Sequence, residues 1–438
     1  MNGETQALDY AADGDRAAAR IAGVSPDTPL RDIGVVAVIG AGTMGGGIAM
    51  CAANAGLPVV LVEQAADALD RGMAAIRRDY ENSVKKGRLS EEEMQRRIAR
   101  IRPTTEAAWI APADLVIEAV FEDIGVKETV FRMLDAKAKP GAILASNTST
   151  LDLDRIAAFT ARPQDVVGLH FFSPANVMRL LEIVRGRQTA PDVLATAMDF
   201  ATRIGKIGVV AGVCDGFIGN RMFEEYLRQA GFLLDEGVMP WQVDQALEAW
   251  GMAMGPFATM DLAGNDVGYA IRKRQAIERP GRAHSKIPDR VAEMGRLGQK
   301  TGAGFYRYDK ATRGRTPDPD IAALVEGHAR EIGLKRRPID DDEIVSRCVL
   351  ALVNEGAKLL VEGIAQRASD IDVVYRNGYG FPAARGGPMF HAGALGLPDV
   401  LAAIDRYRFG YHGEFWQAAP LLRLCADQGR LLSEHVVR

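Results

Sequence analysis

Cysteine is scarce in this chain, with four among 438 residues: Cys51, Cys214, Cys348 and Cys425. They lie far apart and form no CxxC pair, so neither a disulfide framework nor a cysteine-based zinc site is expected. Their scarcity is typical of a protein from a reducing compartment.

An excess of charge of either sign is also lacking, since 53 basic and 57 acidic residues leave a formal net charge of −4. This balance gives no electrostatic reason to expect nucleic acid or an anionic membrane as a partner. No apolar run approaches the 18 residues of a membrane-spanning helix. The acidic N-terminus lacks a signal-peptide core, and the C-terminal EHVVR is no peroxisomal signal of the SKL type. We therefore expect a cytoplasmic protein.

Short apolar runs alternate with helical stretches through the first half of the chain. Residues 33–39 and 57–62 are almost uninterrupted apolar runs, as expected of strands buried on both faces of a parallel sheet. Further strands are predicted at 115–119, 142–145, 166–169 and 207–210. The highly charged segment 69–102 is predicted as a helical hairpin. Alternation of this kind indicates a doubly wound α/β domain.

Strand signals fade after about residue 213, and the chain then repeats itself. RMFEEYLRQAGFLLDEG at 221–237 matches RCVLALVNEGAKLLVEG at 347–363 without gaps, at a constant offset of 126 residues. Each copy continues with an apolar–Asp pair, at 243–244 and 371–372, and then with a Gly/Pro cluster. The pattern favours a duplicated helical domain; two generic amphipathic helices are the alternative.

The predicted fold is an α/β Rossmann-type dinucleotide-binding domain followed by duplicated all-α C-terminal domains. The expected boundaries are an N-terminal helix and linker at 1–32, a Rossmann domain at 33–212, a first helical domain at 213–310, a linker at 311–340 and a second helical domain at 341–438.

A glycine-rich motif follows the first predicted strand. Gly40, Gly42 and Gly45 fit GxGxxG, the motif opens a small-residue helix, and Glu63 ends the next strand. Gly40 would permit the tight turn, Gly42 the approach of a pyrophosphate, and Gly45 close packing of helix on strand. The helix N-terminus, with Thr43 and Met44 in the turn, would then bind the anion. Glu63 would accept hydrogen bonds from a ribose diol and repel a 2′-phosphate, so NAD is favoured over NADP.

One of the six histidines has a placement suited to catalysis. His170 ends the predicted strand 166–169, and open α/β sheets bind their ligands at the carboxyl ends of strands. The apolar wall Phe171–Phe172 and a Ser–Pro loop follow it. Position alone leaves a structural histidine as an equal alternative.

Three segments carry a resemblance to a known family. Asn147-Thr-Ser149, His170-Phe-Phe-Ser-Pro-Ala-Asn-Val-Met-Arg-Leu-Leu-Glu182 and Asp215-Gly-Phe-Ile-Gly-Asn220-Arg221 resemble the signature segments of the 3-hydroxyacyl-CoA dehydrogenase family. The resemblance covers about residues 33–308. The duplicated helical region and the wording FFSP resemble the dehydrogenase half of multifunctional fatty-acid β-oxidation enzymes. It implies NAD-dependent oxidation of (3S)-3-hydroxyacyl-CoA to 3-oxoacyl-CoA.

The resemblance also implies roles for four residues at the reacting carbon. His170 matches the family's general base and Glu182 its paired carboxylate; a salt bridge from Glu182 to a neighbouring arginine is the alternative. Ser149 and Asn220 match polar groups that hydrogen-bond the C3 oxygen of the substrate. For Asn220 the competing interpretation is a helix N-cap.

Further residues match cofactor or substrate contacts of the family. Glu122, Lys127, Asn147 and Lys300 match positions around the cofactor, although exposed charged side chains are commonly only solvated. Lys85 and Lys86 on the charged hairpin would attract the phosphates of CoA; a solvated helix face explains them almost equally well. No metal site is expected.

The second helical copy lacks an Asn–His–Glu set, so we predict a structural role for it. In single-function relatives the helical domain pairs across a dimer, and a second copy could cover the same surface within one chain. A monomer is therefore predicted, with a dimer as the alternative.

Residues 15–42 resemble the junction that follows the hydratase domain in multifunctional relatives. We expect this chain to lack hydratase activity, whether it is a separate dehydrogenase or part of a longer enzyme. A separate enoyl-CoA hydratase or thiolase is a candidate partner. The rival functions are a dehydrogenase of a free hydroxy acid, disfavoured because those relatives typically use a lysine base, and a non-catalytic scaffold.

Overall fold

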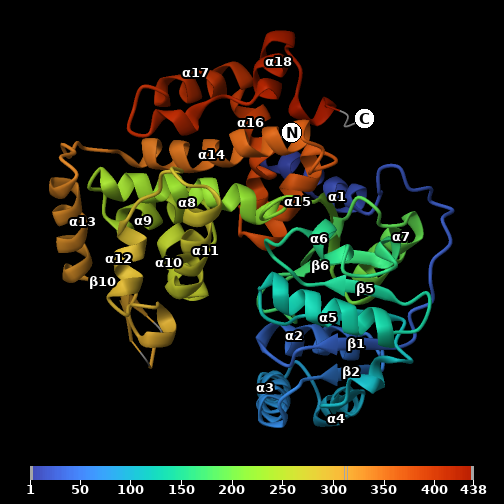
Figure 1. Ribbon diagram of the computed structural model, residues 1–438. Coiled ribbons are helices and arrows are strands. Elements are labelled where there is room, and N and C mark those ends of the chain that lie inside the picture. The colour runs from blue at the N-terminus through green and yellow to red at the C-terminus, as the bar shows by residue number, and fades with distance from the viewer. Residues whose placement is uncertain (1–2, 310, 313, 436–438) are drawn as a thin grey trace. The chain divides into compact units, whose positions relative to one another are not determined.

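A computed structural model describes residues 3–309, 311–312 and 314–435 (Figure 1). The chain forms two compact units. The sheet unit comprises Asp9–Asn220 and Leu359–Tyr379, and the helical unit comprises residues 3–8, 221–358 and 380–435. Within the described part of the chain, no helix has the length and apolar character needed to cross a membrane.

The sheet unit is built around one sheet of eight strands in the order β3-β2-β1-β4-β5-β6-β7-β8. The first six strands run parallel, and β7 pairs antiparallel with β6 and parallel with β8. The order 3-2-1-4-5-6 is that of dinucleotide-binding domains, and it reverses direction between β1 and β4. The strands are β1 (Val36–Ile39), β2 (Val59–Val62), β3 (Ile101–Thr104), β4 (Leu115–Glu118), β5 (Ile143–Ser146), β6 (Val166–Phe171), β7 (Leu180–Arg185) and β8 (Ile207–Gly212).

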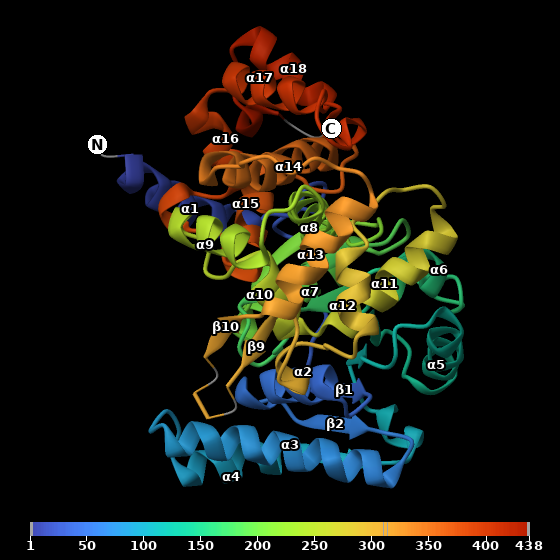
Figure 2. The same cartoon turned by 90° about the vertical axis from the view of Figure 1, so that its left-hand side faces the viewer.

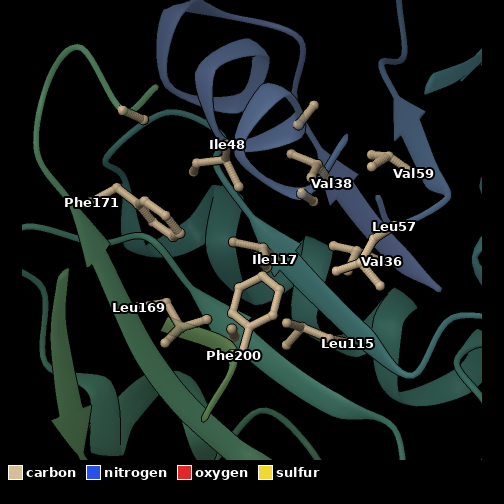
Figure 3. Close-up of a cluster of buried hydrophobic side chains, with 14 of the residues drawn as sticks. Val36, Val38, Ile48, Leu57, Val59, Leu115, Ile117, Leu169, Phe171 and Phe200 are labelled. Atoms are coloured by element: carbon tan, nitrogen blue, oxygen red, sulfur yellow. The ribbon is translucent and has the colours of Figure 1, made fainter. Parts of the chain in front are cut away.

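Apolar side chains from the central strands form the core of this unit. Val38 on β1, Ile117 on β4 and Leu169 on β6 lie in one buried cluster (Figure 3). Ile48 and Phe200 reach the same cluster from α2 (Thr43–Asn54) and α7 (Pro191–Arg203). Strands covered on both faces explain why their sequences read as apolar runs rather than as alternating patterns.

The charged segment after β2 forms the predicted helical hairpin. Helix α3 (Ala66–Lys85) and helix α4 (Glu91–Ala99) pack side by side (Figure 2). Ser90 caps α4 by accepting a hydrogen bond from the N–H of Glu93 at 3.1 Å. The other helices of this unit are α5 (Ile124–Lys137), α6 (Leu153–Ala157), most of α1 (Gly3–Ala18) and α15 (Ala368–Gly378).

The helical unit contains most of both predicted copies. Its helices are α8 (Gly219–Asp235, beginning in the sheet unit), α9 (Pro240–Trp250), α10 (Pro256–Ala263), α11 (Asn265–Glu278), α12 (Ile287–Glu293), α13 (Pro319–Glu331), α14 (Asp341–Val361, ending in the sheet unit), α16 (Pro388–Leu395), α17 (Leu397–Tyr407) and α18 (Pro420–Gln428). A short antiparallel ribbon joins β9 (Tyr306–Tyr308) to β10 (Arg315–Pro317).

The duplication extends beyond the sequence match. Helix α8 corresponds to α14, and α9 corresponds to α15, each of these last two having 11 residues. Both copies bury the predicted aspartate and hydrogen-bond it to a tyrosine hydroxyl at 2.7 Å: Asp244 to Tyr306 in the helical unit, and Asp372 to Tyr10 in the sheet unit. The second copy is thus shared between units, because α15 packs against β7 and β8.

The fold class and the duplicated helices are confirmed. Two strands of the eight-stranded sheet were not predicted: β3 begins at the end of the hairpin segment, and β7 lies within the segment matched to the family. The short ribbon of β9 and β10 was not predicted either. The domain boundaries remain predictions, and the observed units differ from them in assigning α15 to the sheet unit.

Candidate functional site

The glycine-rich turn between β1 and α2 depends on glycine at two positions. Gly40 has φ +101°, and a Cβ there would lie 2.7 Å from the carbonyl oxygen of Ala119. A Cβ on Gly45 would lie 1.9 Å from the carbonyl oxygen of Gly40. Neither position can accept a side chain without moving backbone, so both hold the turn against the sheet and the helix.

The packing of the protein does not itself require glycine at position 42. A Cβ built on it meets no atom within 4 Å, and its φ of −69° is accessible to any residue. It is the N-cap of α2 and makes no side-chain capping bond, so the first N–H groups of the helix, from Thr43 to Gly45, face outward. Open space in front of free N–H groups at a helix N-terminus fits a pyrophosphate.

Glu63 follows β2 and borders the same turn. One of its carboxylate oxygens, Oε2, accepts a hydrogen bond from the N–H of Ala41 at 3.0 Å. The side chain is half-buried and leaves its second oxygen available for a ribose hydroxyl. The glycine turn, the helix N-terminus and this carboxylate together fit NAD.

His170 and Glu182 form the centre of the predicted catalytic site. They are directly opposed in the antiparallel pairing of β6 with β7, so their side chains project from the same face of the sheet. Nδ1 of His170 lies 2.7 Å from Oε2 of Glu182. The histidine is 5% exposed and the glutamate is fully buried. The predicted pair is therefore present as a buried hydrogen-bonded unit.

Glu182 is fixed at its other oxygen as well. Oε1 accepts hydrogen bonds from the N–H of Ile218 at 3.2 Å and of Gly219 at 3.0 Å. These groups belong to the turn before α8, in which Phe217 has a φ of +50°. The alternative of a salt bridge to a neighbouring arginine is wrong, because His170 and two backbone donors use both oxygens.

Two aromatic rings flank His170 within the sheet unit. The ring of Phe172 lies 4.5 Å from the imidazole and that of Phe217 lies 5.7 Å away, measured between centroids. These contacts restrict the imidazole to its orientation toward Glu182.

Glu122 anchors the loop that carries Ser149. Its Oε1 accepts hydrogen bonds from the hydroxyl of Thr148 and the N–H of Ser149, both at 2.7 Å, and the Ser149 hydroxyl lies 3.2 Å away. Burial would raise the pKa of Glu122, but the Lys127 ammonium and these donors outweigh it and hold the pKa below its usual value. Glu122 is thus ionised at neutral pH and bound to the loop after β5.

Lys127, predicted as a cofactor contact, is buried. Its ammonium donates to both oxygens of Glu118, at 2.7 and 2.9 Å, and lies 3.3 Å from Glu122. Ser146 donates to Glu118 at 2.6 Å. Glu118 was missed by the sequence analysis. The available signal was that a glutamate ends the apolar strand β4, beside the point where the strand order reverses. The role that these contacts support for Lys127 is to hold Glu122.

The two predicted asparagines lie on a loop and on a helix of the sheet unit. Asn147 accepts a hydrogen bond from the N–H of Phe171 at 2.9 Å and so ties the loop after β5 to the end of β6. Asn220 lies in the first turn of α8, which begins at Gly219. Its Oδ1 accepts a hydrogen bond from the hydroxyl of Tyr379 at 2.7 Å. Tyr379 was not predicted.

Three further predicted contacts are lysine side chains. Lys300 belongs to the helical unit, where it pairs with Asp266 at 2.6 Å. Lys85 and Lys86 are exposed at the C-terminal end of α3, about 20 Å along the helix from Gly72, which packs on the glycine turn. Their roles remain predictions.

Two family models match the chain. The 3-hydroxyacyl-CoA dehydrogenase NAD-binding domain matches residues 35–214, and the C-terminal domain of the same family matches both 216–308 and 344–435. The first match supports NAD as the cofactor, as predicted, and the second repeats over both helical copies.

Individual proteins agree with the models. The chain is 44% identical over 423 residues to the peroxisomal bifunctional enzyme of Cavia porcellus, covering 93% of this chain and 58% of that protein. The chain thus spans less than two thirds of that relative's length.

Solved structures extend the similarity to the fold. The 3-hydroxybutyryl-CoA dehydrogenase of Escherichia coli K12 superposes with a TM-score of 0.78 at 29% identity, over 91% of this chain and 99% of that one. The dehydrogenase part of multifunctional enzyme 1 from C. elegans gives 0.71 at 27% identity, over 95% and 96%. The chain therefore belongs to the 3-hydroxyacyl-CoA dehydrogenase family of NAD-dependent enzymes.

Proposed function

We propose that this chain oxidises the 3-hydroxyl of (3S)-3-hydroxyacyl-CoA to the 3-oxo group, reversibly, with His170 as general base. The observation that carries the proposal is the buried His170–Glu182 pair at the carboxyl end of β6. NAD, when bound, supplies the hydride acceptor. The protein must supply the base, the groups that hold the reacting oxygen, and a site from which water is excluded.

The hydrogen bonds around Glu182 select the histidine tautomer. Its carboxylate accepts from two backbone N–H groups and faces Nδ1 of His170, so Nδ1 carries the proton and donates to it. The lone pair then lies on Nε2. This nitrogen removes the hydroxyl proton as charge develops on the C3 oxygen, and buried Glu182 stabilises the imidazolium that forms.

Ser149 and Asn220 are assigned to the oxygen that becomes a carbonyl. Ser149 is held by Glu122, and Asn220 is held through its Oδ1, so the amide nitrogen of Asn220 is the end available to donate. Donors fixed before the reaction stabilise developing charge without reorganising. The rings of Phe172 and Phe217 beside His170 keep water from the same region.

The CoA thioester is the substrate class that the family relationship favours. Lys85 and Lys86 are candidates to attract its phosphates, since both are exposed cations on α3. A role in fatty-acid β-oxidation follows from the relatives' names, which include a peroxisomal fatty acid β-oxidation multifunctional protein of Arabidopsis thaliana. Both this relative and that of Cavia porcellus are peroxisomal proteins, so a cytoplasmic location stays a prediction for this chain. The monomeric state and a hydratase or thiolase partner are also predictions.

The test is reduction of acetoacetyl-CoA followed by loss of NADH absorbance, repeated with longer 3-oxoacyl-CoA substrates and with free acetoacetate. We expect turnover of the thioesters and little of the free acid. Turnover of free acetoacetate alone would favour a hydroxy-acid dehydrogenase instead. NADH binding without turnover of any substrate would indicate a non-catalytic scaffold.

A further inference from the structure

The second helical copy places a side chain among the residues of the proposed site. Tyr379 directly follows α15, within the sheet unit. Its hydroxyl donates to Oδ1 of Asn220 at 2.7 Å, and its ring meets that of Phe172 edge-on at 5.6 Å. Phe172 in turn packs against the imidazole of His170.

The packing of α15 brings Tyr379 to this position. The hydroxyl of Tyr375, one turn earlier, donates to the carbonyl of Gly219 at 3.1 Å, and the two tyrosine rings stack at 4.9 Å. Gly219 has no room for a side chain, because a Cβ there would lie 2.4 Å from the ring of Tyr379. Gly219 also donates to Glu182. The tyrosine is therefore seated against the backbone that anchors the catalytic pair.

Comparison of the two copies shows that Tyr379 departs from the repeat. Helices α9 and α15 have the same length, and each carries the repeated aspartate at its fifth position. The residue after α9 is Gly251 with φ +125°, an ordinary helix-ending glycine, whereas the residue after α15 is Tyr379 with φ −123°. At this position the first copy has a glycine, and the second copy has a large hydroxylated side chain.

We propose that Tyr379 is a positioning residue that fixes the amide of Asn220 with its nitrogen toward the substrate. An asparagine amide can turn over and exchange its oxygen for its nitrogen, and a donor held against Oδ1 favours one of the two orientations. Tyr379 keeps its proton for this purpose, since burial and the charge of Glu182 raise its pKa well above the usual value. The second helical copy then does more than cover a surface. This inference rests on the proposed function, because it assumes that Asn220 donates to the substrate oxygen.

Tyr379→Phe removes the hydroxyl and keeps the ring. We expect kcat for acetoacetyl-CoA reduction to fall about tenfold with little change in KM, the loss being that of one oriented hydrogen bond that matters most in the transition state. The matched control is Tyr80→Phe: Tyr80 is a tyrosine whose hydroxyl likewise donates to an asparagine Oδ1, that of Asn54, at 2.8 Å. The control should lose comparable thermal stability and keep kcat within about twofold.

A double-mutant cycle with Asn220→Ala separates positioning from general structure. If Tyr379 acts through Asn220, adding Tyr379→Phe to Asn220→Ala should change kcat by less than about twofold. An equal loss in both backgrounds, or no loss in Tyr379→Phe alone, would overturn this inference and leave the proposed function standing. Absence of turnover in the unmodified chain would overturn the proposed function, and this inference with it.

Discussion

Glu182→Gln is the substitution whose outcome the geometry defines most closely. The side chain keeps its size, but one acceptor oxygen becomes an NH2 donor. Two backbone N–H groups, from Ile218 and Gly219, point at one end of the side chain, and Nδ1 of His170 faces the other. The new amide can place its NH2 group either against the two backbone N–H groups or against His170.

Pairing decides the orientation. Placing the amide NH2 against the two backbone donors would leave both of them buried and unpaired, at about 1–3 kcal/mol each. Placing it against His170 leaves every group paired once the imidazole moves its proton from Nδ1 to Nε2. The variant should therefore fold normally with the wrong histidine tautomer. Nε2 then carries a hydrogen and cannot accept the substrate proton.

The expected loss is about 10²–10⁴-fold in kcat, or about 2.7–5.4 kcal/mol of barrier, by comparison with other orienting carboxylates. Oxidation of 3-hydroxybutyryl-CoA by NAD measures the rate in the direction that needs a free Nε2, and nitrogen-15 NMR of the histidine measures the tautomer. Asp165→Asn is the control: Asp165 is a buried carboxylate paired with Arg31 at 2.8 Å, just before the opposite end of β6. The Asp165→Asn variant should be less stable than the unmodified chain but should keep the same His170 tautomer and the same turnover rate. A folded Glu182→Gln variant that retains the Nδ1–H tautomer or a rate near that of the unmodified chain would refute this reasoning.

Three further results are expected. Gly45→Ala should lower the melting temperature, because the new Cβ would overlap the carbonyl oxygen of Gly40. Gly42→Ala should leave the melting temperature unchanged, because a Cβ there meets no protein atom, and should still weaken NAD binding about tenfold or more, as calorimetry can measure. Lys127→Met should destabilise the chain by about 3–5 kcal/mol in urea unfolding, because it leaves buried Glu118 uncompensated; a loss under 1 kcal/mol would contradict the buried pair. The pKa of Glu122 is lowered in the fold, so its stabilisation is present above its unfolded-state pKa and is lost as the pH falls through the folded value. The melting temperatures of Glu122→Gln and the unmodified chain should therefore differ at pH 7 and converge once the pH lies below that lowered pKa.

Local sequence patterns were sufficient to predict the cofactor turn. Its three glycines, Gly40, Gly42 and Gly45, lie within six residues between a strand and a helix. The structure leaves no room for a Cβ at Gly40 or Gly45, and at Gly42 it leaves open space that a ligand could fill. Strand β7 had no such pattern of its own, because its apolar residues are interrupted by Glu182. The proposed catalytic residue Glu182 thus also obscures β7 as a strand.

Long-range contacts explain what the sequence did not reveal. Tyr379 lies 159 residues from Asn220, and its place after α15 gives no local sign that it reaches the sheet unit. The family resemblance predicted Lys127 as a cofactor contact, with a solvated side chain as the alternative, yet Glu118 and Glu122 both bind it. The position of Tyr379 and the burial of Lys127 were both determined by their binding partners in the fold and not by residue type.

The central claim is that His170 is the general base, and the most direct measurement is acetoacetyl-CoA reduction by His170→Ala alongside its affinity for NADH. We expect turnover to fall by at least about 10²–10⁴-fold while NADH binds as tightly as before, since the glycine turn and Glu63 are untouched. Turnover near the rate of the unmodified chain, with NADH binding intact, would contradict it.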